Sequence, residues 1–473
     1  MNTLETRMNY FNAYQNALIT EINKVIPFQD KPNAPVNSKQ EQQICCCIVN
    51  IFANAEVIKR YGGNAYMFNS IFYEKLNAEN MRNFIFNTAY KSGIILNAKQ
   101  CTWIMNEIIL RTPEYIGIPN DERYTLFQNV YVDNQTGQPL SCIPDYFPTM
   151  CVEAEYLINQ QISVFCPQPY HPTMDMFLDS ITGGDPILIK RFWEVTGYCI
   201  ASDAMAKRIF LLIGESGDNG KSTYLNLLAS LISRHAVTQM NITNLVKGWF
   251  SLGELDLRRL EISADEGFLE LTTAQIAELK NISGHDWISC DVKHKNQSSF
   301  LCTCKILIAS NNNIGAAYTA CDPAFTRRIC SLPFDVRIPK EQQDPLLLQK
   351  LQMEINSIVT EAFHHFVEVR NRNYVFTGDD IYDKNFNMYP NNPLYSMIAE
   401  FSSNSCCFQP NAYSYTADLY DAFTSRYGNE AFRDVTGFSQ AFYKANEAAL
   451  NKHKKHTSEK YAWGFDGVTL KED

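Results

Sequence analysis

The sequence predicts an α/β protein, with a mostly parallel sheet in the middle of the chain, a mostly helical region before it and a small unit after it. Residues from about 173 to 340 alternate strand-like and helix-like segments, as expected where helices connect parallel strands. Before about residue 120, apolar side chains recur at three- and four-residue spacing, which is the period of a helix. After about residue 415, two helix patterns are followed by a short hairpin pattern.

Composition and charge exclude several classes of protein. With 473 residues, 45% hydrophobic and 19% charged, the chain is suited to several folded domains and not to a disordered state. A net charge of −10 argues against a protein that coats nucleic acid with its whole surface, but it allows local basic patches. No apolar run is long enough to span a bilayer and the N-terminus lacks the layout of a secretory signal, so we expect a cytoplasmic protein without membrane contact. The 15 cysteines lack a paired metal-ligand spacing, so we expect reduced thiols.

Changes in residue pattern along the sequence divide the chain into four parts. Strand-like runs surround a turn at Asn134–Gly137, and prolines from Pro167 to Pro172 then mark a boundary. After Pro339, a helical stretch leads into a loop rich in Asn, Asp, Tyr and Pro. We therefore expect an N-terminal domain over residues 1–160, an α/β core over 161–345, a helical segment with a linker over 346–395 and a C-terminal domain over 396–473.

The most informative segment is a Gly-rich loop between a strand pattern and a helix pattern. The apolar run Arg208–Ile213 leads into Gly214–Thr223, and Tyr224–Ile232 then has the pattern of a helix. Glycines allow backbone N–H groups to converge on phosphates, and the helix N-terminus adds its positive dipole end. This pattern predicts a nucleotide site in which Lys221 reaches the β- and γ-phosphates and Ser222 coordinates Mg²⁺. The predicted nucleotide-binding residues are Gly214, Gly217, Asp218, Asn219, Gly220, Lys221, Ser222 and Thr223.

The spacing of this loop leaves two alignments open. Five residues separate Gly214 from Gly220, whereas the usual pattern has four. Either the loop is one residue longer than usual, or Glu215 takes the first position of the pattern.

Two acids and an amide follow at the ends of strand patterns. Leu260–Glu266 ends in Asp265 and Glu266, of which one carboxylate would hold Mg²⁺ and the other would polarise the attacking water. The alternative is an exposed acidic turn, but the position downstream of the Gly-rich loop favours the catalytic interpretation. Asn311 follows the strand pattern Lys305–Ser310, and it would either orient water near the γ-phosphate or form a turn.

A pair of arginines, Arg327 and Arg328, precedes the last strand pattern of the α/β core. The two side chains would either form surface salt bridges or supply a finger to a neighbouring subunit's nucleotide.

In this order, the Gly-rich loop, Asp265-Glu266, Ser310-Asn311 and Arg327-Arg328 resemble the motifs of superfamily-three helicases. The resemblance is to the C-terminal helicase part of phage, plasmid and poxvirus-type primase-helicases. It covers about residues 120 to 340, including lead-in helices at His171–Asp179 and Glu194–Ile200 and a collar module at Phe127–Asp133.

The resemblance implies an AAA+-like P-loop ATPase core, with a helical N-terminal collar that serves in oligomerisation. It also implies a ring, usually a hexamer of identical subunits, that binds ATP between subunits with Mg²⁺ as the metal. Lys221 and Ser222 would bind ATP and Mg²⁺, and Asp265 would be a second metal ligand. The residues given catalytic roles are Lys221, the hydrolytic acid Asp265 or Glu266, the sensor Asn311, and the finger Arg327 or Arg328 acting in trans.

Cationic residues at two places predict contacts with DNA. Lys293, His294 and Lys295 lie in a turn between two strand patterns, where they would contact phosphates without reading sequence. A solvated basic turn is the alternative, but in the resembled family this hairpin lines the central pore. The C-terminal pattern predicts a winged-helix-like domain in which Lys454 and Lys455 would contact duplex DNA, although such domains also serve as protein-contact modules.

The leading hypothesis is an ATP-dependent replicative DNA helicase of a mobile genetic element, such as a phage, plasmid or genomic island. Its expected partners are single-stranded and forked DNA, further copies of itself, and a separate primase or host replication proteins in the host cytoplasm. The alternative is a replication initiator or DNA-binding scaffold that uses ATP as an assembly switch with little unwinding. A P-loop kinase of small molecules is a weaker third hypothesis, since no lid or substrate pocket is recognisable.

Overall fold

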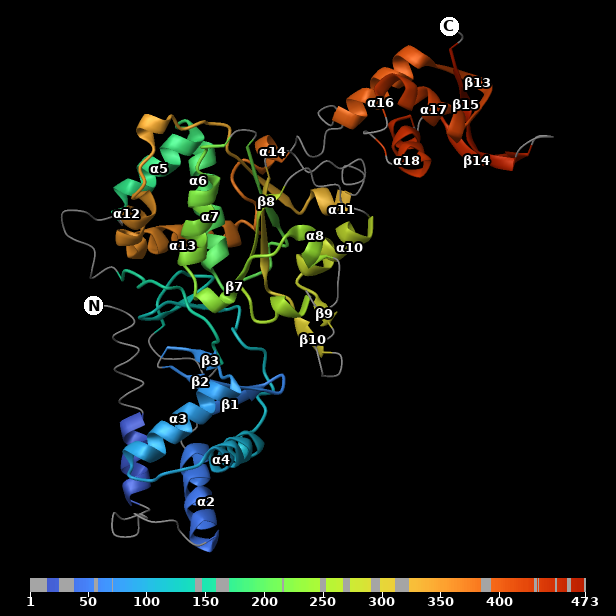
Figure 1. Ribbon diagram of the computed structural model, residues 1–473. Helices are drawn as coiled ribbons and strands as arrows, with labels where there is room; N and C mark the ends of the chain where they lie inside the picture. The colour runs from blue at the N-terminus through green and yellow to red at the C-terminus, as the bar shows by residue number, and fades with distance from the viewer. Residues whose placement is uncertain are drawn as a thin grey trace.

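The structure is a computed structural model, shown in Figure 1, with the N-terminal region in blue, the central region in green to orange and the C-terminal unit in red. No helix within the described residues is both long and apolar enough to cross a membrane. The structure describes residues 15–24, 38–54, 58–69, 71–140, 147–158, 170–214, 217–246, 252–266, 273–290, 298–310, 323–383, 393–428, 432, 434–446, 449–456 and 461–471.

A five-stranded parallel sheet lies in the central region. Its strands are β6 (Ile209–Ile213), β7 (Val237–Thr238), β8 (Leu260–Glu266), β11 (Lys305–Ser310) and β12 (Ile329–Pro333). They lie in the order β12-β6-β11-β8-β7, and every neighbouring pair is parallel. The chain therefore leaves β6 for the far edge at β7, returns through β8 and β11, and finishes beside β6 at β12. The prediction of an α/β fold with a mostly parallel sheet is confirmed.

One face of the sheet is covered by a layer of helices (Figure 1). Phe210 and Leu212 of β6 are buried against this layer, whereas Ile209 and Leu211 are buried on the opposite face. The alternation follows from the two-residue period of a strand. The helices of this layer are α5 (Pro172–Thr182), α6 (Pro186–Ile200), α7 (Lys221–Ser230), α12 (Leu347–Met353) and α13 (Ile355–Asn371).

The opposite face carries shorter elements and a hairpin. They are α8 (Ile242–Leu245), α10 (Thr273–Ile282), α11 (Pro323–Thr326) and the antiparallel strands β9 (Trp287–Cys290) and β10 (Ser298–Leu301). Both faces are thus buried, as a parallel sheet requires. The remaining short elements of the central region are α14 (Asp379–Tyr382) and 3-10 turns at Arg234–Ala236, Gly253–Leu255 and Lys340–Gln342.

The N-terminal region contains helices packed around a core of its own, together with a small sheet. The helices are α2 (Ser38–Asn54), α3 (Ala78–Lys91) and α4 (Ala98–Arg111), and residues 15–24 are also helical. The helical pattern predicted these elements, but it did not predict the antiparallel sheet β1 (Ile58–Tyr61), β2 (Asn64–Phe68) and β3 (Tyr73–Lys75). Strands of three to five residues are too short to show a clear alternation. The strand-like runs that follow form β4 (Tyr124–Leu126) and β5 (Tyr131–Asp133).

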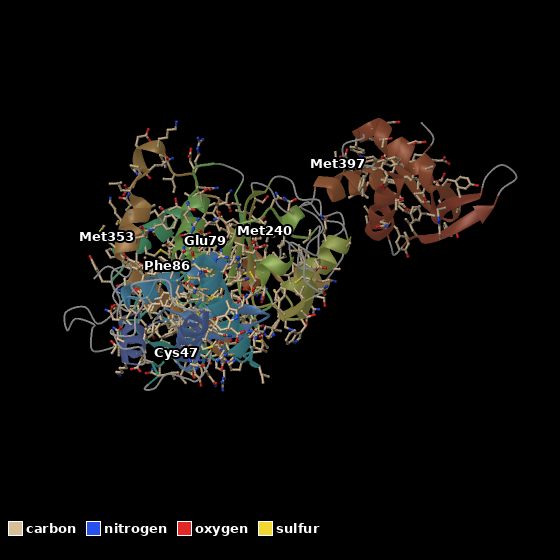
Figure 2. All side chains as sticks on the ribbon, turned by 60° about the horizontal axis from the view of Figure 1, so that its bottom comes forward. Cys47, Glu79, Phe86, Met240, Met353 and Met397 are labelled. Atoms are coloured by element: carbon tan, nitrogen blue, oxygen red, sulfur yellow. The ribbon has the colours of Figure 1, made fainter. Side chains whose placement is uncertain are left out.

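The C-terminal unit stands apart from the rest of the chain in Figure 1, and also in Figure 2, where Met397 marks it. Its elements are α16 (Pro393–Ser405), β13 (Cys406–Tyr415), α17 (Thr416–Tyr427), α18 (Val435–Ala445), β14 (Asn451–His456) and β15 (Tyr461–Leu470). The strands form an antiparallel sheet in the order β13-β15-β14. The two predicted helices correspond to α17 and α18. The small hairpin predicted within Tyr461–Val468 is wrong, because that segment forms one strand, β15, which pairs with β14. Helix α16 and strand β13 were not part of that prediction.

Helices α6 and α13 approach each other closely at Gly197. A Cβ atom added at Gly197 would lie 1.8 Å from the carbonyl oxygen of Ala362, so the contact requires a residue without a side chain. This contact fixes α13 against α6, the helix that precedes β6.

We predict that Gly197→Ala lowers the stability of the fold by about 3 kcal/mol, because the backbone of α13 must move away from the added methyl group. Thermal melting measures the loss. Gly217→Ala is the matched control, since no atom lies within 4 Å of a Cβ added there. Equal melting temperatures for the two variants would contradict the close approach of the helices.

Candidate active site

The Gly-rich loop connects strand β6 to α7. Gly220 directly precedes the first helical residue, Lys221, and has a φ of +88°. A Cβ added at Gly220 would also lie 2.7 Å from Cγ2 of Ile181 on α5, so both conformation and space favour glycine here. Asp218 has a positive φ of +59°. These two turns bring the chain sharply into α7, whose N-terminus, with no side-chain cap at Gly220, is suited to an anion.

Three strands of the sheet end at the same level beside this loop. Ser310, the last residue of β11, is paired with Ile213 of β6 and with Glu266 of β8. The backbone N–H of Gly214 donates a hydrogen bond of 3.3 Å to the carbonyl of Ser310. Because the strand order reverses at β6, the carboxyl ends of these strands are the place where open α/β sheets bind ligands. The loop and the ends of β8 and β11 therefore lie together at the carboxyl ends of these strands.

Lys221 extends inward beneath the loop and is 8% exposed. Its Nζ donates a hydrogen bond of 2.6 Å to the carbonyl oxygen of Gly214 and a longer one of 3.4 Å to that of Ser310. A buried ammonium requires such acceptors, since burial of an unpaired charge is costly. The charge is thus held between the ends of β6 and β11, within the loop that would surround a phosphate.

A hydrogen bond from the Asn219 side chain connects the Gly-rich loop to the segment that follows β12. The side chain is 3% exposed, and its Nδ2 donates to the carbonyl of Phe334 at 3.2 Å. The backbone N–H of Phe334 in turn donates to the carbonyl of Ile213 at 2.6 Å, and that of Ile338 donates to the carbonyl of Asp218 at 2.8 Å. The loop is therefore supported on the side facing β12 by main-chain and amide contacts, and its shape depends on that segment.

Two clefts open on either side of the loop and the start of α7. The smaller one, of about 350 Å³, is lined by Lys221 and Ser222 together with Met240, which is labelled in Figure 2, and with Ala264 and Ala309 near the ends of β8 and β11. It is the space nearest to both the lysine and the acid-bearing strand, so a metal ion held by Ser222 would lie there.

The larger cleft, of about 890 Å³, lies between the loop, α5 and the segment after β12. Its walls include Phe177, Ile338, Lys340 and Lys350. These two lysines were not predicted as site residues, because no motif marks them and only the fold brings them to the loop. Arg337 was also missed, and its guanidinium lies 4.0 Å from the Asp218 carboxylate in an exposed ion pair.

A buried acid, Glu261 on β8, holds the segment that lines the smaller cleft. Its carboxylate accepts hydrogen bonds from the backbone N–H of Met240, at 2.8 Å, and from the hydroxyl of Thr238. Burial raises the pKa of Glu261 to about 7, although the Met240 N–H acts in the opposite direction. Glu261 was not predicted as part of the site, and it contacts the site through the Thr238 hydroxyl and the Met240 backbone.

Several predicted site residues fall outside what the structure describes. Asp265 and Glu266 lie at the end of β8, where the backbone is described and the side chains are not. Asn311 and the turn Lys293-His294-Lys295 lie outside the described residues. The same turn is flanked by the strands β9 and β10, in agreement with the predicted hairpin. Lys454 and Lys455 lie on β14, again with side chains outside the description.

Arg327 and Arg328 lie at the opposite end of the sheet from Lys221. They directly precede β12, whose first residue, Ile329, pairs with Ile209 at the start of β6. The five residues of β6 separate that level from the loop, a distance on the order of 15 Å along the strand. The structure therefore does not bring either arginine to the nucleotide loop of its own chain.

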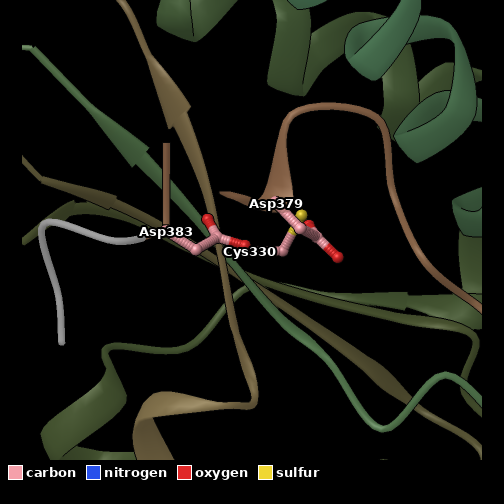
Figure 3. A group of neighbouring side chains, drawn as sticks. All are labelled: Cys330, Asp379 and Asp383. Carbon is pink, nitrogen blue, oxygen red and sulfur yellow. The ribbon is translucent and has the colours of Figure 1, made fainter. Parts of the chain in front are cut away.

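A compact group of Cys330, Asp379 and Asp383, shown in Figure 3, has the residue types of a metal site. However, two guanidinium groups already neutralise both carboxylates: Arg191 lies 2.7 Å from each, and Arg208 lies 2.5 Å from Asp379. Two positive and two negative groups in contact form an ion-pair network, and its interpretation requires no metal.

Comparison with known proteins gives a family match for the middle of the chain and distant structural matches for most of it. Residues 212–328 match a family model described as a family of unknown function (DUF5906). No curated protein matches the sequence. Among solved structures, the A form apo structure of the NrS-1 C-terminal region is similar at 10% identity, with a TM-score of 0.47 over 87% of this chain and 95% of that one. Another apo structure of the NrS-1 C-terminal region (305–718) has 10% identity and a TM-score of 0.44, over the same shares of the two chains. With TM-scores below 0.5 at 10% identity, the likeness does not indicate an activity.

We predict that Glu261 makes the fold less stable as pH rises. An acid with a higher pKa in the folded protein binds an extra proton on folding, so its contribution is lost between its ordinary value of 4.5 and the folded value of about 7. Relative to Glu261→Gln, the wild type should lose roughly 3 kcal/mol of stability between pH 5 and pH 8. Melting temperatures of both proteins across this range test the prediction. A constant difference between the two proteins would contradict a raised pKa at Glu261.

Proposed function

We propose that the protein is an ATP-driven DNA helicase that acts in the replication of a mobile genetic element. The observation that carries the proposal is the convergence of the Gly-rich loop, the buried Lys221 and the ends of β8 and β11 at one edge of a parallel sheet. This edge combines a phosphate-binding loop with the strand that ends in two acids, which is the set of groups that nucleoside triphosphate hydrolysis requires.

The loop is suited to the phosphates of ATP for steric and electrostatic reasons. A Cβ at Gly214 would lie 2.5 Å from the carbonyl of Phe334, so the backbone there passes too close to its neighbours for another residue. Lys221 would exchange its carbonyl partner for phosphate oxygens when ATP binds, and Ser222 and Asp265 would hold Mg²⁺. When bound, the metal ion would supply positive charge that offsets the charge developing on the phosphates. Glu266 or Asp265 orients and polarises the attacking water, and Asn311 holds that water in line with the γ-phosphate.

The strand order supports an AAA+-like assignment of the core. Numbered along the chain, the strands lie in the order 5-1-4-3-2, so that β11 separates the loop-bearing strand β6 from the acid-bearing strand β8. Because Arg327 and Arg328 lie at the far end of their own sheet, a finger role requires a second subunit. A closed ring of identical subunits, in number usually six, gives every site such a neighbour.

Two parts of the chain would bind DNA. The β9–β10 hairpin flanks Lys293, His294 and Lys295, which would follow the phosphate backbone of a single strand in the ring's pore. The C-terminal unit has the order helix, strand, helix, helix, strand, strand, which supports a winged-helix-like assignment. In it Lys454 and Lys455 lie on β14 beside β15 and would contact duplex DNA at the fork.

A second candidate function is a replication initiator or scaffold that binds DNA and uses ATP as an assembly switch. It is favoured by the separate C-terminal unit, which has its own core and its own sheet. In that case the ring would assemble on ATP but displace little DNA.

We predict that Lys221→Ala lowers ATP hydrolysis by at least 100-fold while the protein still folds, because the ammonium group between β6 and β11 is lost. Phosphate release measures the rate, and thermal melting checks the fold. Lys190→Ala is the control: this lysine lies on α6, paired with Glu368 at 3.0 Å, and not at the nucleotide loop. Hydrolysis by Lys221→Ala at the wild-type rate would overturn the assignment of the loop.

We predict that Lys293→Ala combined with Lys295→Ala lowers DNA-stimulated ATP hydrolysis about tenfold and spares most of the basal rate, because phosphate contacts in the pore are lost. The two rates are measured with and without single-stranded DNA, with Lys190→Ala again as the control. Equal losses of basal and stimulated hydrolysis would contradict a contact between these two lysines and DNA in the pore.

A further inference from the structure

The turn that carries Arg327 and Arg328 is held in place from the neighbouring strand. Nη1 of Arg208, directly before β6, donates to the carbonyl oxygens of Arg327, at 3.0 Å, and Ile329, at 3.2 Å. The backbone N–H of Ile209 donates to the carbonyl of Arg328 at 2.6 Å. All three carbonyls of the turn therefore point inward to groups at the start of β6.

The two arginine side chains of this turn differ in their surroundings. Arg328 is connected to helix α11, since its Nη1 donates to the carbonyl of Ala324 at 2.6 Å, and its Nε is buried with no hydrogen-bond partner among the described residues. Arg327, in contrast, has an exposed side chain. With its carbonyl held by Arg208 and its side chain more exposed than that of Arg328, Arg327 is the better candidate to reach a neighbouring subunit.

Arg208 is itself oriented by a carboxylate. Its Nη2 donates to Oδ2 of Asp379 at 2.5 Å, while Oδ1 of the same carboxylate accepts from the fully buried Arg191 at 2.7 Å (Figure 3 shows Asp379 beside Asp383). Asp383 accepts from Arg191 at 2.7 Å and from the backbone N–H of Ser331, on β12, at 2.8 Å. The network therefore connects α6, β12 and α14. It orients Arg208 toward the turn that carries Arg327 and Arg328, called the arginine turn below.

Only an arginine can serve at position 208 in this way. One guanidinium reaches two carbonyls with one nitrogen and a carboxylate with another, which a lysine ammonium on a flexible stem does not reproduce in fixed geometry. The Arg208 side chain is 16% exposed and that of Asp379 18%, so solvent only partly screens the pair.

We propose that Arg208, oriented by Asp379, is a positioning residue for Arg327, and that this pair sets the geometry with which one subunit supplies its finger to the next. The inference rests on the proposed function, because it assigns a support to the finger of that ATPase. It adds a role for an ion-pair network that would otherwise only stabilise the junction between β12 and α14.

The test uses mixtures of full-length subunits with complementary defects. A Lys221→Ala subunit has a defective nucleotide site and an intact arginine turn, whereas an Arg327→Ala subunit has an intact site and no finger. Their mixture should recover hydrolysis that neither protein has alone, which provides the reference. Asp379→Asn and Arg208→Lys are then each measured alone and mixed with Lys221→Ala.

Each of these two variants alone should hydrolyse ATP at least tenfold more slowly than the wild type, bind a fluorescent ATP analogue with unchanged affinity, and recover in the mixture as Arg327→Ala does. Asp203→Asn is the matched control: it breaks a buried ion pair with Arg370, at 2.9 Å, that does not contact the arginine turn. It should lose thermal stability without the pattern of recovery in the mixture.

Wild-type hydrolysis by both Asp379→Asn and Arg208→Lys would overturn the positioning role. So would a loss that Lys221→Ala subunits do not restore when they do restore Arg327→Ala, since the defect would then lie in the variant's own site or fold. Failure of the reference mixture itself would overturn the finger in trans, and with it the support assigned to Arg208. Absence of hydrolysis by the wild type would instead overturn the proposed function.

Discussion

The burial of the Lys221 ammonium beneath the Gly-rich loop is the constraint on which the rest of the site depends. A buried charge must be surrounded by acceptors, and the carbonyls of Gly214 and Ser310 supply them. Both carbonyls are in place because β6 and β11 are parallel neighbours that end at the same level. The acid-bearing strand β8 ends at that level too, since Ser310 also pairs with Glu266. The contacts of the buried Lys221 ammonium therefore depend on the register of β6 and β11, and β8 ends at the same level.

The two ends of the sheet differ in how their buried cations are paired. At the end opposite the loop, buried cations are paired within the protein: Lys305 donates to the carbonyl of Ala201, and Arg259 donates to that of Ile200 at 2.6 Å. These carbonyls belong to the C-terminus of α6, where positive charge is favourable. Burial, together with the nearby charge of Arg259, lowers the pKa of Lys305 to about 7. The end with the loop has two clefts that could hold a ligand.

The sequence predicted those parts of the structure that follow from local patterns. The loop was predictable because Gly214–Thr223 has a regular order of glycine, lysine and hydroxyl residues between a strand and a helix. The parallel sheet was predictable from the alternation of apolar segments. Neither the partners of Lys221 nor the closeness of Lys340 and Lys350 to the loop could be predicted, because they depend on contacts between residues far apart in the chain. The raised pKa of Glu261 and the support of Arg327 by Arg208 have the same origin, since burial and side-chain networks arise only when the elements pack.

The central claim is that ATP hydrolysis drives the separation of DNA strands, and strand displacement on a forked DNA substrate tests it most directly. The wild type with ATP and Mg²⁺ should release the displaced strand, and Lys221→Ala under the same conditions should not. DNA-stimulated hydrolysis by the wild type without any strand release would contradict the helicase account and favour an initiator that uses ATP for assembly.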